Sequence, residues 1–124
     1  MQPILVVEDE VNIRKFISVN LKARGYEVIE AGSAEEALEI LRENMPAAAL
    51  LDIRLPGMDG WDLLATIAKD PDLPDVPVVV VTGSIVHDAL VEAAYDNLVD
   101  VLAKPIQLHH LLKSVQRAIG ATGI

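Results

Sequence analysis

The stretch LLDIRLPGMDG, residues 50–60, ends a hydrophobic run on a carboxylate. Ala48–Ile53 is expected to form a buried strand, and Asp52 lies at its carboxyl end. Pro56 and two glycines then indicate a turn. An aspartate in this position usually caps backbone N–H groups of the turn and does nothing more. A functional role for Asp52 therefore needs chemical partners elsewhere in the chain.

Short aliphatic runs alternate with amphipathic segments on both sides of this stretch. Strands are expected at Ile4–Val7, Tyr26–Glu30, Ala48–Ile53, Val76–Val81 and Val99–Ala103. Helices are expected around Ile13–Leu21, after the capping box Ser33-x-x-Glu36, and at Gly60–Lys69, Ile85–Tyr95 and Leu108–Ala118. Strands that alternate with helices indicate an α/β fold with a parallel sheet and right-handed crossovers. We expect one domain over residues 1–124.

The composition is that of a globular chain with an aliphatic core. Hydrophobic residues make up 52% of the sequence and aromatic residues only 3%. The 19 acidic and 10 basic residues give a net charge of −9, which repels nucleic-acid phosphates. No cysteine is present, which excludes disulfides, thiolate metal sites and cysteine nucleophiles. We expect no direct nucleic-acid binding by this chain.

The sequence also lacks the marks of membrane insertion or secretion. No apolar run approaches the roughly 18 residues needed to span a bilayer. The N-terminal stretch MQPILVVEDE has no basic region and soon reaches acidic residues, unlike a signal peptide. We therefore expect a cytoplasmic protein without membrane association.

Polar side chains stand at the carboxyl ends of four expected strands, where open α/β sheets bind their ligands. They are Glu8 and Asp9 after the first strand, Asp52 at the end of the third, Thr82 at the end of the fourth, and Lys104-Pro105 at the end of the fifth. The second strand ends at Glu30, which is interpreted as a solvated residue. If the sheet is parallel, these carboxylates, the hydroxyl and the amine converge on one edge.

Three carboxylates about 5 Å apart repel one another by roughly 3 kcal/mol per pair at an effective dielectric constant near 20. A cation among them removes this repulsion, and an oxygen-only ligand set suits Mg²⁺. Together with Lys104, Mg²⁺ balances three negative charges. Asp52 can then act as a nucleophile and form an aspartyl-phosphate, with Thr82 donating a hydrogen bond to the phosphoryl group.

These motifs resemble the receiver domains of bacterial two-component response regulators. The resemblance rests on Glu8-Asp9, the D-x-x-L-P-G-M-D-G motif at Asp52–Gly60, Thr82 and Lys104-Pro105, in this order over essentially the whole chain. It implies a flavodoxin-like, doubly wound, five-stranded parallel sheet of order 2-1-3-4-5 with five helices. It also implies a signalling domain that catalyses only its own phosphoryl transfer and dephosphorylation, not a conventional enzyme.

The resemblance assigns a role to each acidic residue. Asp52 would accept a phosphoryl group from the phosphohistidine of a histidine kinase or from a small phosphodonor. Asp9 would bind Mg²⁺ directly and Glu8 through water. Asp52 and the backbone carbonyl of Arg54 would complete the protein ligands.

The resemblance extends to the other site residues and to partners. Lys104 would pair with Asp52 or the phosphoryl group, and Thr82 would move on phosphorylation. The Lys104-Pro105 bond is expected to be cis, and Asp59 to cap the third helix. The implied partners are a sensor histidine kinase or phosphotransfer protein and a downstream protein or output domain. The chain itself is expected to be a monomer or weak dimer.

One position departs from the family pattern. Family members commonly carry Tyr or Phe three residues before the lysine, and this aromatic ring rotates inward when the threonine moves. Here the position holds Val101, which cannot make that rotation. We therefore expect the phosphorylation chemistry to be intact and its conformational readout to be altered.

Each motif alone has a simpler structural interpretation. Glu8-Asp9 can be a charge pair at a helix N-terminus, Thr82 a strand-end hydroxyl and Lys104 a solvated lysine. Their combination at successive strand ends favours the phosphoacceptor site. Trp61 is interpreted as a packing residue.

Three alternative functions fit the sequence less well. A phosphatase of the haloacid-dehalogenase type needs a second aspartate two residues after the nucleophile, where this chain has Arg54. A flavin-binding module needs a hydroxyl- and glycine-rich loop after the first strand, where Glu8-Asp9 would repel the phosphate. A degenerate receiver that acts only in protein interaction would not be expected to keep every site residue.

Overall fold

The computed structural model describes residues 2–83 and 96–120. The elements follow one another as β1 (Ile4–Val7), α1 (Val11–Ala23), β2 (Val28–Ala31), α2 (Ala34–Glu43), β3 (Ala48–Asp52), α3 (Gly60–Lys69), β4 (Val78–Thr82), β5 (Leu98–Ala103) and α5 (Leu108–Gly120). The helix expected at Ile85–Tyr95 lies outside the described residues.

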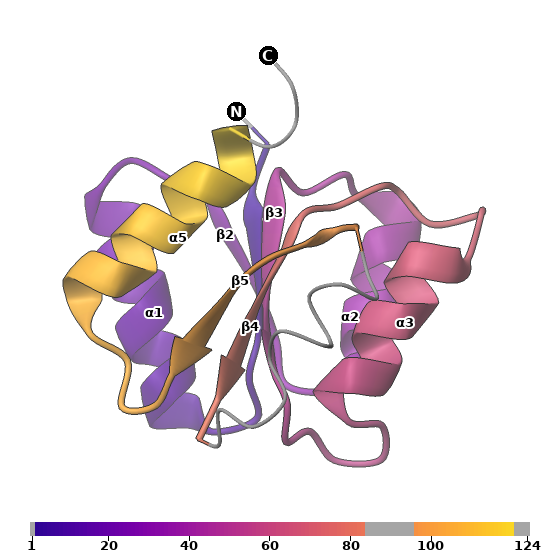
Figure 1. The fold of residues 1–124 in the computed structure, drawn as a ribbon, viewed down its shortest axis with the longest axis horizontal. Helices are drawn as coiled ribbons and strands as arrows, with labels where there is room; N and C mark the ends of the chain where they lie inside the picture. The colour runs from indigo at the N-terminus through magenta and orange to yellow at the C-terminus, as the bar shows by residue number, and fades with distance from the viewer. Residues whose placement is uncertain (1, 84–95, 121–124) are drawn as a thin grey trace.

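The five strands form one parallel sheet of order β2-β1-β3-β4-β5, as predicted. Helices α1 and α5 cover one face, and α2 and α3 cover the other (Figure 1). The chain turns from one side of β1 to the other between β2 and β3. The carboxyl ends of β1 and β3 therefore form the topological switch point at which such sheets bind ligands.

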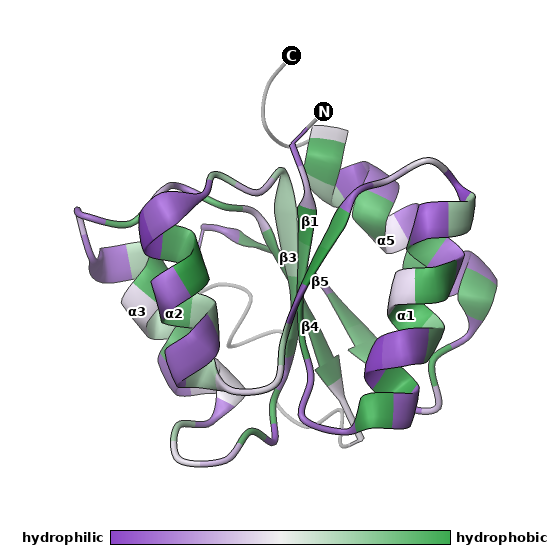
Figure 2. Cartoon of the chain, turned by 180° about the vertical axis from the view of Figure 1, so that it is seen from behind, coloured by the Kyte–Doolittle hydropathy of each residue, from purple (hydrophilic) through white to green (hydrophobic). Residues whose placement is uncertain are grey.

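The sheet separates two aliphatic cores. In β1, Leu5 and Val7 pack in the core beneath α2 and α3, whereas Ile4 and Val6 pack beneath α1 and α5. The same alternation runs through β3 and β4, because successive side chains of a strand point to opposite faces. The helices accordingly present their hydrophobic sides to the sheet and their hydrophilic sides outward (Figure 2). Burial on both faces explains the nearly continuous hydrophobic runs of the inner strands.

Two strands begin later than predicted, for local reasons. β4 begins at Val78, since Pro77 has no N–H group to donate to a neighbouring strand. β2 begins at Val28, because the Tyr26 N–H still donates to the Leu21 carbonyl at the end of α1. Thr82 is the last residue of β4, as expected.

Side-chain caps begin α2 and α3. Ser33 Oγ accepts a hydrogen bond from the Glu36 N–H at 3.2 Å, as the capping box predicts. Glu36 Oε1, however, accepts from the N–H of Gly32 at 2.6 Å and not from that of Ser33. Asp59 Oδ1 accepts from the Asp62 N–H at 2.8 Å, which confirms the predicted cap of α3.

Two glycines shape the loop that follows Asp52. Gly57 has a φ angle of 82°, in the left-handed region that side chains disfavour. Gly60 donates from its N–H to the Ile53 carbonyl at 2.7 Å. A Cβ atom on Gly60 would overlap the carbonyl of Asp52 and lie 2.7 Å from Ile53 Cα. The start of α3 is therefore packed directly on the end of β3.

Strand β5 contains a β-bulge. The pairing with β4 shifts by one residue between Leu98 and Asp100, and Val99 is the extra residue. Asp100 accepts a hydrogen bond from Ser114 Oγ at 2.6 Å and lies 3.1 Å from Arg117 Nη1. These contacts tie the bulged strand to α5.

We predict that Gly60→Ala lowers the free energy of unfolding by about 1–3 kcal/mol, because the added methyl group displaces the main chain of β3. Urea denaturation followed by circular dichroism measures this change. Gly120→Ala is the matched control, since nothing lies within 4 Å of its Cβ position. Equal effects of the two substitutions would contradict the close approach of α3 to β3.

We predict the opposite sign for Ser18→Ala. Ser18 is 2% exposed, and its Oγ has no hydrogen-bond partner within residues 2–83 and 96–120. Alanine removes this unsatisfied hydroxyl and has the higher helix propensity. The free energy of unfolding should rise by about 0.5–1.5 kcal/mol in the same denaturation assay. A lower stability would show that the hydroxyl makes a favourable interaction.

Candidate functional site

Three carboxylates meet at the carboxyl ends of β1 and β3. Glu8 and Asp9 directly follow β1, and Asp52 is the last residue of β3. One carboxylate oxygen from each residue lies within 4.8 Å of the other two. Glu8 and Asp52 are 1% and 3% exposed, whereas Asp9 is open to solvent. The parallel sheet therefore brings together the acidic residues that were predicted to meet at this edge.

Lys104 supplies a positive charge to this cluster. Its Nζ lies 3.2 Å from Glu8 Oε1 and 3.2 Å from Asp52 Oδ1. Its backbone N–H donates to the carbonyl of Thr82 at 2.9 Å, which fixes the chain where β5 ends beside β4. The Lys104-Pro105 bond is cis, as predicted. One ammonium group thus contacts two nearly buried carboxylates.

The pKa values of Glu8 and Lys104 respond to this crowding. Burial, followed by the contact with Asp52, raises the pKa of Glu8 to about 7. Burial acts to lower the pKa of Lys104, but the adjacent Asp52 and Glu8 carboxylates outweigh it and the pKa is raised. Glu8 therefore binds a proton far more readily than an ordinary glutamate.

The cluster fits a hard divalent cation. Its three carboxylates face one lysine, which leaves an excess of negative charge when all three are ionised. Glu8 Oε1 is buried and, apart from the Lys104 ammonium group at 3.2 Å, has no partner in the described part of the chain. Oxygen ligands of this kind suit Mg²⁺ in charge and chemistry.

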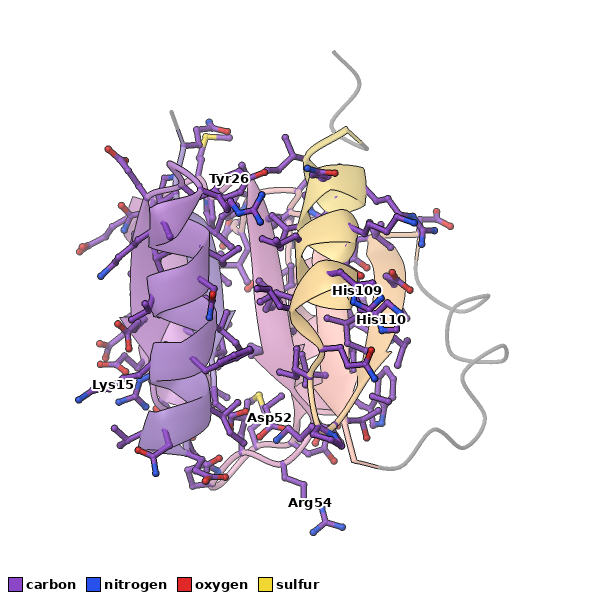
Figure 3. All side chains as sticks on the ribbon, turned by 90° about the vertical axis from the view of Figure 1, so that its left-hand side faces the viewer. Lys15, Tyr26, Asp52, Arg54, His109 and His110 are labelled. Atoms are coloured by element: carbon purple, nitrogen blue, oxygen red, sulfur yellow. The ribbon has the colours of Figure 1, made fainter. Side chains whose placement is uncertain are left out.

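Arg54 and Thr82 border the cluster in different ways. The backbone N–H of Arg54 donates to Asp52 Oδ1 at 3.2 Å. Its side chain is exposed and points away from the body of the protein (Figure 3). Arg54 therefore reaches Asp52 through its main chain. Thr82 is 6% exposed and ends β4, the strand that pairs with β3.

One cation near the site was not predicted from the sequence. Arg14 of α1 donates from Nη1 to the carbonyl of Glu8 at 2.8 Å. Its Nε lies 3.0 Å from Glu30 Oε1, so Glu30 is an ion-pair partner and not only a solvated residue. A lone arginine in an amphipathic helix gives no sequence signal for such a contact.

Trp61 and Val101 pack against the core on the face of the sheet covered by α2 and α3. Trp61 is half-buried against the core beneath α2 and α3, as interpreted from the sequence. Val101 is also half-buried against this core. The altered readout expected from Val101 stays a prediction.

Comparisons with known proteins agree with this geometry. The family model described as "Response regulator receiver domain" matches residues 4–116. The phosphate regulon transcriptional regulatory protein PhoB of Pseudomonas aeruginosa is 30% identical over 120 residues, covering 97% of this chain and 52% of PhoB. The C4-dicarboxylate transport transcriptional regulatory protein DctD of Rhizobium meliloti is 36% identical over 116 residues, covering 93% of this chain and 25% of DctD.

Solved structures give the same result. A CheY-like receiver domain protein from Methanospirillum hungatei JF-1 has a TM-score of 0.86 at 27% identity, covering 98% of this chain and 95% of that one. The chemotaxis response regulator CheY4 of Vibrio cholerae has a TM-score of 0.84 at 26% identity, and the match covers 95% of this chain and 98% of CheY4.

The fold is a parallel α/β sheet with a cluster of three carboxylates at its switch point. The chain belongs to the family of response regulator receiver domains. It spans about half the length of PhoB and a quarter of that of DctD. No helix in residues 2–83 and 96–120 has the length and apolar character to cross a membrane.

We predict that Glu8 makes the stability of the metal-free protein depend on pH. Its pKa of about 7 in the folded state lies above the ordinary value of 4.5. The associated stabilisation is therefore complete below pH 4.5 and lost as the pH rises through about 7. Glu8→Gln cannot ionise at this position. Relative to this variant, the free energy of unfolding of the wild type should fall by about 1–3 kcal/mol between pH 4.5 and pH values above 7.

Urea denaturation in the presence of a chelator, repeated across this pH range, measures the difference. Asp9→Asn serves as a control, because Asp9 is an exposed member of the same cluster. Parallel stability curves for the wild type and Glu8→Gln would contradict the raised pKa of Glu8.

Proposed function

We propose that this chain is a Mg²⁺-dependent phosphoacceptor in a two-component phosphorelay and that Asp52 carries the phosphoryl group. The observation that carries this proposal is the placement of Lys104, 3.2 Å from both Asp52 and Glu8, in a carboxylate cluster at the switch point of a receiver fold. The lysine and a divalent cation would together offset the charge of an incoming phosphoryl group.

We assign the metal ligands by the resemblance to receiver domains, and the close approach of the Glu8, Asp9 and Asp52 carboxylates is consistent with that assignment. Asp9 and Asp52 would bind Mg²⁺ directly, Glu8 would bind it through water, and the backbone carbonyl of Arg54 would complete the protein ligands. When bound, the ion supplies positive charge for the oxygens of the phosphoryl group. Glu8 Oε1 is buried, and Lys104 is its one charged partner in the described residues, which leaves it able to meet a cation or a metal-bound water.

The proposed reaction is an attack by the Asp52 carboxylate on phosphorus. The Arg54 N–H and the Lys104 ammonium group both contact Oδ1, so we assign the attack to Oδ2. The new O–P bond forms as the bond from phosphorus to the donor's histidine nitrogen breaks, and the bonding electron pair stays with the leaving imidazole. The product is an aspartyl-phosphate. Lys104 then pairs with a phosphoryl oxygen, and the Thr82 hydroxyl donates a hydrogen bond to another.

The partners follow from the same chemistry. The donor would be a sensor histidine kinase, a phosphotransfer protein or a small phosphodonor. The phosphorylated domain would act on a downstream protein or an output domain, since PhoB and DctD are transcriptional regulators about two and four times as long. We place the domain in the cytoplasm as a monomer or weak dimer. Its net charge of −9 argues against nucleic-acid binding by this chain itself.

We predict that acetyl phosphate with Mg²⁺ adds one phosphoryl group to the wild-type chain and none to Asp52→Asn. The carboxamide that this substitution introduces is a poor nucleophile, and a chelator should abolish the reaction of the wild type. Intact-mass spectrometry measures both effects.

Asp59→Asn is the matched control, because Asp59 lies in the same loop and asparagine also caps helices. This variant should react like the wild type. Modification of Asp52→Asn, or a reaction that persists without Mg²⁺, would refute the proposal.

A further inference from the structure

We infer that Arg14 is a positioning residue for the acidic pair, holding the Glu8 main chain so that the Glu8 and Asp9 carboxylates face Asp52 at a spacing suited to a divalent cation. This inference rests on the proposed function, because it assigns Arg14 to that cation site.

A single guanidinium group joins the ends of two neighbouring strands. Arg14 Nη1 donates to the carbonyl of Glu8, directly after β1, at 2.8 Å. Arg14 Nε lies 3.0 Å from Oε1 of Glu30, the penultimate residue of β2. The arginine side chain is only 20% exposed. Such a planar group with fixed donors can hold two acceptors at once, which a lysine cannot do in the same way.

The surrounding main chain is shaped to receive this side chain. A Cβ atom on Gly32 would lie 3.3 Å from Arg14 Nη1, tighter than most contacts of this kind. The Gly32 N–H is itself held by Glu36 Oε1 at 2.6 Å. The N–H of Glu8 donates to the carbonyl of Ala31 at 3.0 Å. The main chain of Glu8 is therefore fixed through its N–H by β2 and through its carbonyl by Arg14.

Fixing this carbonyl also orients Asp9. The peptide unit is planar, so the Glu8 carbonyl and the Asp9 nitrogen and Cα move as one body. The turn continues directly into α1, and Glu8 Oε2 accepts from the Glu10 N–H at 3.2 Å. Loss of the Arg14 contact would release this peptide unit and allow the Glu8 and Asp9 carboxylates to separate.

Loss of the Arg14 charge and loss of the Arg14 contact should change the Mg²⁺ affinity in opposite directions, so the two effects can be distinguished. A positive charge near a cation site weakens metal binding, even though Glu30 offsets part of the charge of Arg14. Removal of the arginine charge by itself would therefore strengthen Mg²⁺ binding. A weaker affinity after removal of Arg14, in a variant that stays folded, is opposite in sign to this charge effect and indicates lost positioning.

We predict that Arg14→Met lowers the Mg²⁺ affinity about 10-fold, because the loss of a group that holds a metal ligand in place commonly has an effect of this size. Isothermal titration of the whole chain with MgCl₂ measures the dissociation constant independently of phosphorylation. Lys15→Met is the matched control, because it removes the same charge from an exposed neighbour on the same helix (Figure 3). This variant should bind Mg²⁺ as tightly as the wild type or slightly more tightly.

Two further variants separate shape from charge. Glu30→Gln keeps an oxygen that can accept from Arg14 Nε and should stay within about 3-fold of the wild-type affinity. Arg14→Lys keeps the charge but cannot bridge both acceptors, and its affinity should fall between those of the wild type and Arg14→Met. Urea denaturation of each variant records stability separately from affinity.

Unchanged Mg²⁺ affinity in Arg14→Met, with or without a loss of stability, would overturn the inference. Equal weakening in Lys15→Met would also overturn it, since the effect would then not depend on the Glu8 contact. If Arg14→Met does not fold, wild-type affinity in Arg14→Lys decides against the inference. A wild-type chain that binds no Mg²⁺ would instead refute the proposed function, and the inference with it.

Discussion

The carboxyl edge of the sheet holds more negative than positive charge, and this imbalance determines the chemistry of the site. Lys104 contacts both Asp52 and Glu8, yet three carboxylates share the site with this one ammonium group. The raised pKa of Glu8, about 7, shows that a proton can take the place of the missing charge. A divalent cation can do so as well, and in the proposed function metal and proton compete for the same group of oxygens. The cluster therefore carries an excess of negative charge that either a proton or a bound cation can offset.

The surrounding residues hold the main chain and leave the carboxylates available. Gly60 packs against the carbonyl of Asp52, and Arg14 binds the carbonyl of Glu8. The backbone of Arg54 and the side chain of Lys104 meet the same oxygen of Asp52. Acidic residues can therefore be held close together without using up the oxygens that a metal or phosphoryl group needs. The groups that hold the main chain beside the strand ends are accordingly small, as at Gly60, or planar, as in the guanidinium group of Arg14.

Much of the site could be predicted from the sequence because a parallel sheet converts local patterns into spatial ones. Each hydrophobic run ends in a polar residue, and parallel strands place these ends together, so Asp52 and Lys104 were identifiable without coordinates. Strand limits were less predictable: β4 begins at Val78 and not at Val76 because of Pro77. The Arg14–Glu30 bridge and the β-bulge at Val99 were missed: the first depends on the distance between a helix and a strand end, the second on the register of β4 and β5, and residue spacing encodes neither. The cap of α3 by Asp59, in contrast, is local and was predicted.

The packing of α3 on β3 has a consequence for spectroscopy. The chain has a single tryptophan, Trp61, and it follows the glycine that touches the carbonyl of Asp52. Its indole ring is half-buried on the face covered by α2 and α3. Its emission should therefore respond to a shift at the end of β3 and much less to rearrangements beneath α1 and α5. Trp61 fluorescence is therefore an intrinsic probe of one face of the sheet.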